Sequence, residues 1–327
     1  MRALAGLLVA VLALGGCGGD STPPAAGPGA TPTLTPATGN PFADGEPYAD
    51  PDSRAARAAA DAEAAGDVDA ARVYARLAAT PSGIWLTPEQ YPPGEVGAEV
   101  ARVVGDAAEQ DQVPVFVVYG IPDRDCTGGF SGGGLPADQY GPWVQEIAAE
   151  AGGSVVVVEP DALASALECD RRDERVRLIG DAVEVLADAG ASTYVDGGHS
   201  HWVDPEQLAA VMREAGVEGA RGFATNVSNY QTDDDERAYA EQLSGLLGGA
   251  HYVIDSGRNG RGSTEQWCNP AGRAFGREPE VVDDGSALDA YLWVKPPGES
   301  DGECQGGPAA GELWAERALE MGAASGW

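Results

Sequence analysis

Seven short apolar segments alternate with amphipathic helical patterns along most of this chain. The segments are rich in valine and aromatic residues, as expected for strands, and the stretches between them place apolar residues at helical spacing. The strand candidates are residues 82–86, 113–119, 154–159, 192–196, 219–225, 251–255 and 287–295. This alternation is typical of parallel strands joined by crossover helices, in either a closed barrel or a doubly wound sheet. No internal repeat and no composition shift after residue 50 marks a second domain.

The first 17 residues have the pattern of a secretion signal. Arg2 precedes an apolar run that is too short to span a bilayer comfortably, and small residues stand directly before Cys17. The ending LGGC resembles a bacterial lipoprotein signal, which predicts cleavage and lipidation at Cys17; a plain signal peptide is the alternative. Residues 18–50, dominated by Pro, Gly, Thr and Ala, predict a disordered tether. The organisation expected is a signal at 1–17, a tether at 18–50 and one folded domain at 51–327, held by lipid at the outer face of the membrane.

The charge balance restricts the partners. The chain has 52 acidic and 20 basic residues, a formal net charge of -32 at pH 7. This charge repels nucleic acid and anionic lipid headgroups, so we expect no nucleic-acid partner and membrane contact only through the lipid on Cys17. A neutral or cationic partner is favoured, although solubility alone would also account for the acidity. We expect the protein to be a monomer.

The cysteines form an even set once Cys17 is removed. Two disulfides are the simplest account of the four that remain in an oxidising compartment. A four-cysteine zinc site is the alternative, although no pair has the close CxxC spacing that such sites use. The four are Cys126, Cys169, Cys268 and Cys304.

Polar and aromatic residues follow each predicted strand. In a parallel α/β barrel the loops at the carboxyl ends of the strands converge and build the active site. One polar strand end would mean little, but here all seven strands have one. The residues are Trp85, Tyr119, Arg124, Asp125, Glu159, Asp161, Asp196, His199, Trp202, Asn226, Asp255, Arg258, Lys295, Glu299 and Asp301.

Several chemistries are poorly supported. The chain has no GxSxG elbow, and CTGGFSGGG lacks the Lys-Ser/Thr ending of a phosphate-binding loop. Asp196, His199 and His201 are possible metal ligands, a less favoured alternative because only one other histidine is present. Carboxylates beside aromatic residues instead suit hydrolysis of glycosidic bonds, in which one acid protonates the leaving oxygen and another carboxylate assists water.

Seven ordered blocks resemble the signatures of family 6 glycoside hydrolases, inverting β-1,4-glucanases and cellobiohydrolases that act on cellulose. The likeness spans about residue 80 to the C-terminus. It implies a distorted seven-stranded parallel α/β barrel, similar in form to a TIM barrel, as a single catalytic domain with no metal or organic cofactor. The blocks are VVYGIPDRDC (117–126), VVVVEPDALA (155–164), YVDGGHSHW (194–202), RGFATNVSNY (221–230), IDSGRNG (254–260), QWCNPAGRAFG (266–276) and LWVKPPGESDG (292–302).

The resemblance assigns Asp161 as the general acid. A carboxyl placed after a strand of valines should be partly desolvated, which raises its pKa. Glu159 is expected to point the other way and to serve structure. Asp125 matches the aspartate that holds the acid protonated and helps to place the water.

The remaining roles also follow from the resemblance. Asp301 matches the proposed catalytic base, with activation of water through a relay as the alternative. Ser131 matches a serine on a mobile loop that carries the water chain, and Tyr119 a tyrosine near the distorted sugar. Substrate-binding positions are matched by Asp196, His199, Asn226, Lys295 and Glu299, and sugar-stacking platforms by Trp85, Trp202 and Trp267. The disulfides implied are Cys126–Cys169 and Cys268–Cys304, each clamping a loop that carries an aspartate.

Loop length favours internal cleavage. Only 35 residues lie between Cys268 and Cys304, including the last strand, whereas the family's cellobiohydrolases enclose their cleft with longer loops. We therefore expect a short-looped, open-cleft endo-β-1,4-glucanase acting on cellulose or a related β-glucan. An exo-acting cellobiohydrolase and a non-catalytic, lipid-anchored glucan-binding protein are the alternatives.

Overall fold

A computed structural model describes residues 39–43 and 45–327, which lie in one compact unit around a single sheet. The strand order is β1-β2-β3-β4-β5-β6-β8-β7, with neighbours parallel except for the β7–β8 pair. All seven predicted strands are present, so the α/β prediction is confirmed. The strands are β1 (Ile84–Leu86), β2 (Val115–Val118), β3 (Val155–Val158), β4 (Ser192–Asp196), β5 (Gly222–Thr225), β6 (His251–Asp255), β7 (Glu280–Val281) and β8 (Leu288–Leu292).

The sheet curls without closing into a complete barrel. The two-residue strand β7, which the sequence did not predict, takes the outer edge of β8. Near the first strand, the Gly83 N–H donates to Trp293 O at 2.8 Å, but β1 and β8 do not form a ladder. The sheet is therefore a distorted, half-closed form of the predicted barrel.

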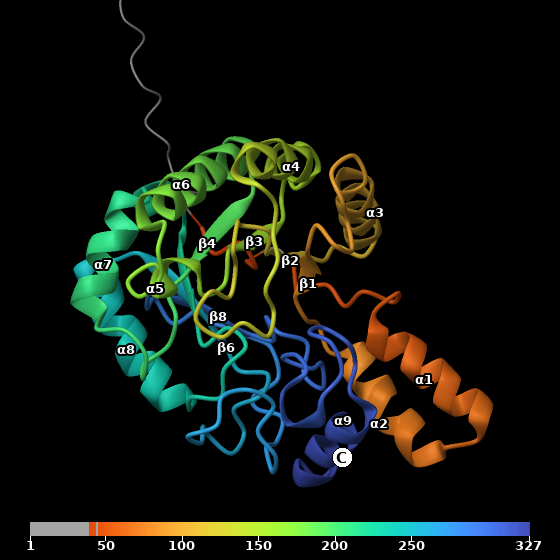
Figure 1. Ribbon diagram of the computed structural model, residues 1–327. Coiled ribbons are helices and arrows are strands. Elements are labelled where there is room, and N and C mark those ends of the chain that lie inside the picture. The colour runs from red at the N-terminus through yellow and green to blue at the C-terminus, as the bar shows by residue number, and fades with distance from the viewer. Residues whose placement is uncertain (1–38, 44) are drawn as a thin grey trace, which may run out of the picture. The chain divides into compact units, whose positions relative to one another are not determined.

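Helices cover the outer face of the sheet in an arc (Figure 1). The long ones are α3 (Val96–Ala108), α4 (Ala137–Glu150), α6 (Arg172–Asp188), α7 (Pro205–Glu214) and α8 (Asp233–Leu246). Val156 and Val158 pack beneath them, whereas Val155 and Val157 point into the interior of the curled sheet. Because side chains alternate along a strand and both faces are covered, β3 reads as an unbroken valine run.

A helical hairpin stands beside β1. It consists of α1 (Arg54–Ala65) and α2 (Val68–Ala79), and α9 (Ala315–Ala324) packs against α2. Ser53 Oγ and Asp67 Oδ1 each accept a backbone N–H of the following helix, as helix caps do. Between the two helices, Gly66 adopts a left-handed conformation that ends α1.

The ordered domain begins before the predicted boundary at residue 51. Asn40 Nδ2 donates to Val282 O and Asp289 O, and Phe42 is buried in the interior of the sheet. The last part of the predicted tether is therefore packed against the domain. The predicted signal at 1–17, Cys17 and residues 18–38 lie outside the described residues. Within residues 39–43 and 45–327, no helix has the length and apolar character needed to cross a membrane.

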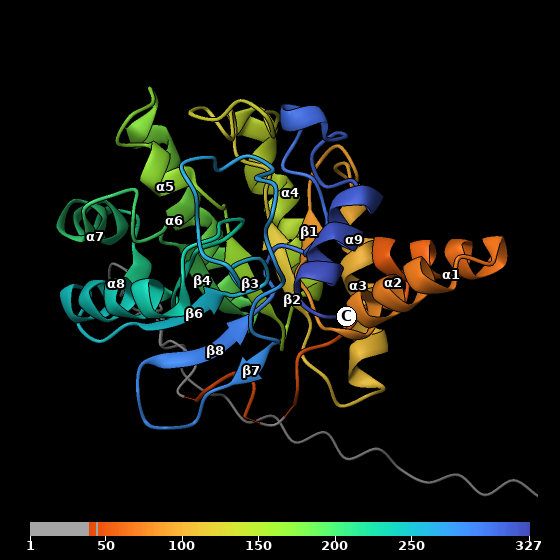
Figure 2. The same cartoon turned by 90° about the horizontal axis from the view of Figure 1, so that it is seen from below.

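The loops that carry the predicted site lie at one edge of the domain. Figure 2 shows α5 (Ala162–Ser165) and the loop between β2 and α4 at the upper edge, and β7 at the lower edge. Two disulfides fasten these loops, Cys126–Cys169 and Cys268–Cys304, as predicted. All four cysteines are thereby paired, so the zinc alternative is wrong.

Candidate active site

Strand β3 ends in an unusual turn. Glu159 and Asp161, on either side of Pro160, both have left-handed backbone conformations, with φ of 50° and 68°. Glu159 is buried, and its Oε1 accepts the Gly120 N–H at 2.9 Å, whereas Asp161 faces a cleft. The two side chains diverge as predicted, although residues two apart share a face of a regular strand. The backbone turn separates them.

Asp161 lies beside a second buried carboxyl. The Asp161 N–H donates to Asp196 Oδ2 at 2.9 Å, and the Gly198 N–H donates to the same oxygen at 3.0 Å. Burial raises the pKa of Asp196 to about 7. Burial, followed by the charges of Asp196, Asp125 and Asp301, raises the pKa of Asp161 well above its ordinary value. Asp161 therefore keeps its proton to a higher pH than an exposed aspartate does.

Arg175 is the cation that opposes this shift, and the sequence did not single it out. Its guanidinium is buried on α6 and donates to Ala162 O and Ser165 Oγ, which holds α5 in place. Arg175 stands at helical spacing with the buried Leu178, Ile179 and Ala182. An arginine on the apolar face of a predicted helix was the signal that could have revealed it.

Asp125 organises the loop that follows it. Its Oδ1 accepts the Gly128 N–H at 3.1 Å, and its Oδ2 accepts the N–H groups of Phe130 and Ser131 at 2.7 and 2.6 Å. A Cβ at Gly128 would overlap Asp125 Oδ1, so a larger residue there would displace the Asp125 carboxylate. Asp125 also lines the cleft that contains Asp161.

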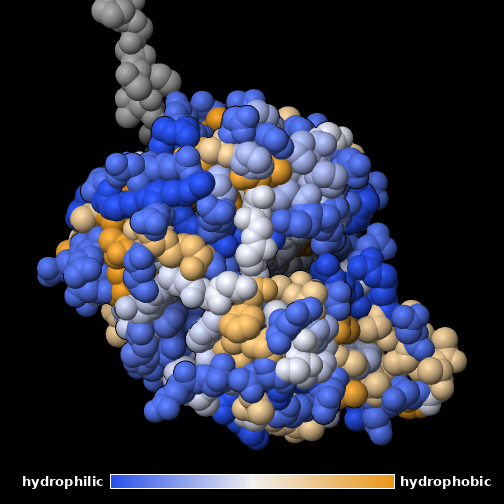
Figure 3. Space-filling model, in the orientation of Figure 1, coloured by the Kyte–Doolittle hydropathy of each residue, from blue (hydrophilic) through white to orange (hydrophobic). Residues whose placement is uncertain are grey.

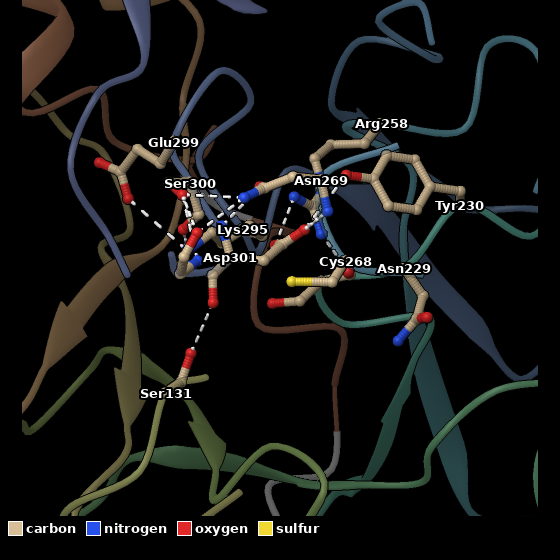
Figure 4. Close-up of polar contacts among 12 residues, drawn as sticks. Ser131, Asn229, Tyr230, Arg258, Cys268, Asn269, Lys295, Glu299, Ser300 and Asp301 are labelled. Carbon is tan, nitrogen blue, oxygen red and sulfur yellow. Dashed lines mark hydrogen bonds and ion pairs between the residues drawn. The ribbon is translucent and has the colours of Figure 1, made fainter. Parts of the chain in front are cut away.

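Asp301 lies in a different environment (Figure 4). Its Oδ1 is 2.7 Å from Arg258 Nη1, and the two residues are only 6% and 2% exposed. Its Oδ2 accepts the Asn269 N–H at 2.9 Å and the Tyr230 hydroxyl at 3.4 Å. Both carboxylate oxygens are therefore engaged, and Asp301 is not among the described residues that line the cleft with Asp161. The sequence placed Arg258 after a predicted strand, but nothing in it indicated that Asn269 would hold Asp301.

Ser131 connects the two aspartate loops. Its N–H donates to Asp125 Oδ2, and its Oγ donates to Asp301 O at 3.0 Å (Figure 4). The ring of the neighbouring Phe130 lies 5.7 Å from that of Trp267. The loop after Asp125 is therefore attached to the turn at Asp301.

The cleft has a volume of about 560 Å³ and aromatic walls. Trp202 donates from Nε1 to Glu168 Oε1 at 2.9 Å, and its ring lies 5.7 Å from that of His199. Trp267 is 46% exposed. Burial lowers the pKa of His199 to about 4, so its ring is neutral at ordinary pH. The cleft thus combines carboxyls with flat surfaces that suit sugar rings.

A second group of predicted residues surrounds Trp85. The ring of Tyr119 meets the Trp85 ring edge-on at 5.1 Å, and Lys295 Nζ lies 5.1 Å above the Trp85 ring. Lys295 Nζ is also 3.9 Å from Glu299 Oε2. Burial lowers the pKa of Lys295 and raises the pKa of Glu299.

Asn226, a predicted substrate-binding residue, does not line the cleft, and neither does Asp196. Asn226 is fully buried, and its Nδ2 donates to Gln231 O and Asp255 O while its Oδ1 accepts the Gln231 N–H. Its side chain therefore shapes the loop after β5.

The metal alternative also lacks the required geometry. Asp196 Oδ2 is occupied by two backbone N–H groups, and His201 Nδ1 lies 2.7 Å from Gln231 Oε1. In the part of the chain that the structure describes, no group of three or more His, Cys, Asp or Glu side chains is arranged to hold a metal ion.

Comparison with known proteins agrees with this geometry. The sequence profile of glycosyl hydrolases family 6 matches residues 42–324. Endoglucanase A of Cellulomonas fimi is 46% identical over 253 residues, which cover 77% of this chain and 56% of that protein. Endoglucanase 1 of Streptomyces sp. (strain KSM-9) is 42% identical over 241 residues, covering 71% of this chain and 66% of that protein. The chain spans between half and two thirds of the length of these relatives.

A solved structure is similar over most of the fold. The endoglucanase Cel6 from Mycobacterium tuberculosis, solved in complex with a methyl-cellobiosyl-4-deoxy-4-thio-β-D-cellobioside, superimposes with a TM-score of 0.82 at 42% sequence identity. The match covers 88% of this chain and all of that one. With the profile, this extent of similarity shows that the chain belongs to glycosyl hydrolase family 6.

Proposed function

We propose that this protein hydrolyses internal β-1,4-glucosidic bonds of cellulose or a related β-glucan, with inversion at the anomeric carbon. The observation that carries the proposal is Asp161, a carboxyl whose pKa is raised by burial and by neighbouring carboxylates, in a cleft with tryptophan walls. A carboxyl that remains protonated near neutral pH can donate its proton to the leaving oxygen. Trp202 and Trp267 then hold sugar rings on either side of the cleft.

Asp125 and Asp196 support the acid in different ways. Both raise the pKa of Asp161 through their charge, and Asp196 also accepts the Asp161 N–H. Asp125 faces the cleft, so it can also help to place the attacking water. Tyr119, Trp85, Lys295 and Glu299 form the sugar-binding surface next to the acid, and His199 lines the cleft beside Trp202.

Water activation is assigned to a relay that ends at Asp301. Asp301 is paired with Arg258 and lies outside the cleft lining, which disfavours direct contact with the attacking water. Ser131 touches both Asp125 and the Asp301 loop. A chain of water molecules past Ser131 would pass the proton toward Asp301 while that carboxylate stays fixed. In this scheme Asn226 is a positioning residue rather than a substrate contact.

Internal cleavage is supported by the endoglucanase names of the relatives reported above. The exo-acting alternative would give few internal cuts, which the viscometry described below detects.

We infer that the protein works outside the cytoplasm. The two disulfides support an oxidising compartment. Lipidation at Cys17, attachment to the cell surface and a monomeric state complete the proposal. Mass spectrometry of the protein from membranes tests the first two, since a diacylglyceryl mass on Cys17 is expected.

Viscometry of carboxymethylcellulose, run alongside release of reducing ends, tests the main proposal. The full chain should lower viscosity steeply while few new ends appear. Reducing ends without that fall would support exo action. Binding of cello-oligosaccharide with neither signal would support the non-catalytic glucan-binding protein.

No metal or organic cofactor enters the proposed mechanism. We therefore expect EDTA to leave the rate of reducing-end release unchanged after exhaustive dialysis. Loss of activity that returns with a divalent cation would contradict this mechanism.

A further inference from the structure

A second cavity lies on the other side of Trp85. It has a volume of about 310 Å³ and lies between the α1–α2 hairpin, β1 and the turn at residues 296–299. Figure 3 shows the surface hollowed above β1, next to the segment that leads into α1. Trp85 and Glu299 line this cavity, and the other lining residues have no role in the mechanism described above. We call this cavity the α1 groove.

One wall of the α1 groove is a connected series of polar side chains. Arg54 Nη1 lies 3.5 Å from Glu299 Oε1, and Arg54 Nη2 donates to Gln90 Oε1 at 3.0 Å. Gln90 Nε2 donates to the Tyr91 hydroxyl at 2.8 Å, and that hydroxyl donates to Glu99 Oε1 at 3.3 Å. These contacts hold donors and acceptors in fixed positions along the groove.

The α1 groove adjoins the surface that holds sugar in the proposed function. Trp85 contacts Tyr119 and Lys295 on the active-site side and also lines the groove. Glu299 is paired with Lys295 and with Arg54. Trp85 and Glu299 therefore belong both to the active-site surface and to the α1 groove. A bound glucan chain that passes Trp85 enters the groove.

The lining selects a neutral, hydroxyl-rich ligand. Acidic and basic side chains are interleaved along the groove, so no single charge dominates it. The net charge of -32 also disfavours an anion. Amide, guanidinium and carboxylate groups next to aromatic rings match the hydroxyls and the apolar faces of sugars.

Helix α1 itself contributes little to the core. None of its residues is fully buried, in contrast to α2, where Val73, Tyr74 and Leu77 are buried. Helix α1 rests on α2 through the partly buried Ala58, Ala59 and Ala62, and its N-terminal end, at Arg54 and Ala55, forms a wall of the groove.

We propose that the α1 groove binds further glucose units of a glucan chain that extends past Trp85, on the side away from Trp202 and Trp267. This inference rests on the proposed function. It makes α1 a determinant of the length of chain that the protein binds best.

Two variants test the proposal. Arg54→Ala removes the central contact of the wall, and Gln90→Ala removes an exposed neighbour that does not touch Glu299. Arg72→Ala, on the exposed face of α2, is the matched control. Initial rates are measured on cellotriose, cellotetraose, cellopentaose and cellohexaose with the full chain, and thermal melts verify that each variant is folded.

The expected result is a loss that grows with chain length. Losing a hydrogen bond to a charged group should raise KM for cellohexaose about tenfold in Arg54→Ala, and losing a neutral one about threefold in Gln90→Ala. Cellotriose and cellotetraose should lose much less, and Arg72→Ala should behave like the unaltered chain. The preferred bond of cellohexaose should shift in the two groove variants.

Three outcomes would overturn the proposal or its basis. Unchanged KM for cellohexaose in both variants would show that the groove does not bind substrate. Equal losses on all chain lengths in Arg54→Ala, with no effect in Gln90→Ala, would show that Arg54 acts only through Glu299. Absence of cleavage by the unaltered chain on any of these substrates would instead contradict the proposed function.

Discussion

Asp161 and Asp301 lie in opposite electrostatic environments, although the sequence places both aspartates after a strand. The end of β3 surrounds Asp161 with other carboxyls, and the guanidinium of Arg175 opposes the resulting rise of its pKa. The turn after β8 holds Asp301 against the buried guanidinium of Arg258. Like charges and burial favour the neutral acid, whereas an ion pair favours the carboxylate.

This difference indicates how one edge of a sheet can give two aspartates different surroundings. Around Asp161, burial and neighbouring carboxyls raise the pKa, and Arg175 opposes that rise only in part. Around Asp301, the groups Arg258, Asn269 and Tyr230 satisfy the carboxylate oxygens. Four variants or conditions can separate the two regions, beginning with the largest expected effect.

Replacing Asp161 by Asn should have the largest effect. The variant keeps the shape of the side chain but cannot donate the proton, so kcat on carboxymethylcellulose should fall by about 10²–10⁴-fold. Calorimetric titration with cellotetraose should show nearly unchanged binding. Asp181→Asn, on the exposed face of α6, is the control. Full activity of Asp161→Asn would remove the general acid from the mechanism.

Replacing Arg258 by Met should have the second-largest effect, which is a loss of stability. The substitution leaves Asp301 buried without its cation, which should lower the free energy of unfolding by about 3–5 kcal/mol. Urea denaturation measures this loss. The double variant Arg258→Met with Asp301→Asn should recover part of it, because no charge is then buried. Equal stability of Arg258→Met and the unaltered chain would mean that the pair is not needed to hold Asp301.

Acidic pH should stabilise the region around Asp161. Burial raises the pKa of Glu159, Asp196 and Glu236 to about 7 each, above the values of about 4 in an unfolded chain. The folded state therefore binds more protons, and its stability should decrease as the pH rises from about 4 to 7, by up to about 3 kcal/mol for each group. Melting temperatures at pH 5 and pH 8 test this.

Glu236→Gln provides the control for the pH effect. The amide cannot titrate, so the difference in melting temperature between pH 5 and pH 8 should be smaller in this variant. A higher melting temperature at pH 8 than at pH 5 in the unaltered chain would contradict the raised pKa values.

Replacing Asp196 by Asn should have the smallest effect. It removes a negative charge beside Asp161 while an amide oxygen can still accept the Asp161 N–H. The pKa of Asp161 should decrease, and the alkaline limb of the kcat profile should move to lower pH by about one unit. A limb that stays in place or moves to higher pH would show that Asp196 does not support the acid through its charge.

Much of the fold could be predicted from local patterns. The valine runs at 115–118 and 155–158 identified buried parallel strands, and the seven strand segments appear in the structure where they were expected. Such patterns indicate which segments are buried, and they can be read from residues that are neighbours in the chain. The start of the domain was missed because Asn40 and Phe42 stand in a segment whose composition resembles a linker.

The site was predicted less completely for a related reason. The sequence placed Asn226 at a strand end, but only the folded structure turns its amide toward Gln231 and Asp255. It also gave no sign that the Ser131 loop contacts the Asp301 turn, 170 positions away along the chain. Contacts across such distances leave no periodic signal.

The sequence by itself determined the family, the α/β fold, the even set of cysteines and the aspartates at the carboxyl ends of the strands. Only the tertiary structure decided which of those aspartates lies among carboxyls and which is paired with an arginine. The reason is physical, since a pKa depends on burial and on charges a few ångströms away. The neighbours that make the two surroundings differ, Asp196 beside Asp161 and Arg258 beside Asp301, lie at or just after the ends of other strands.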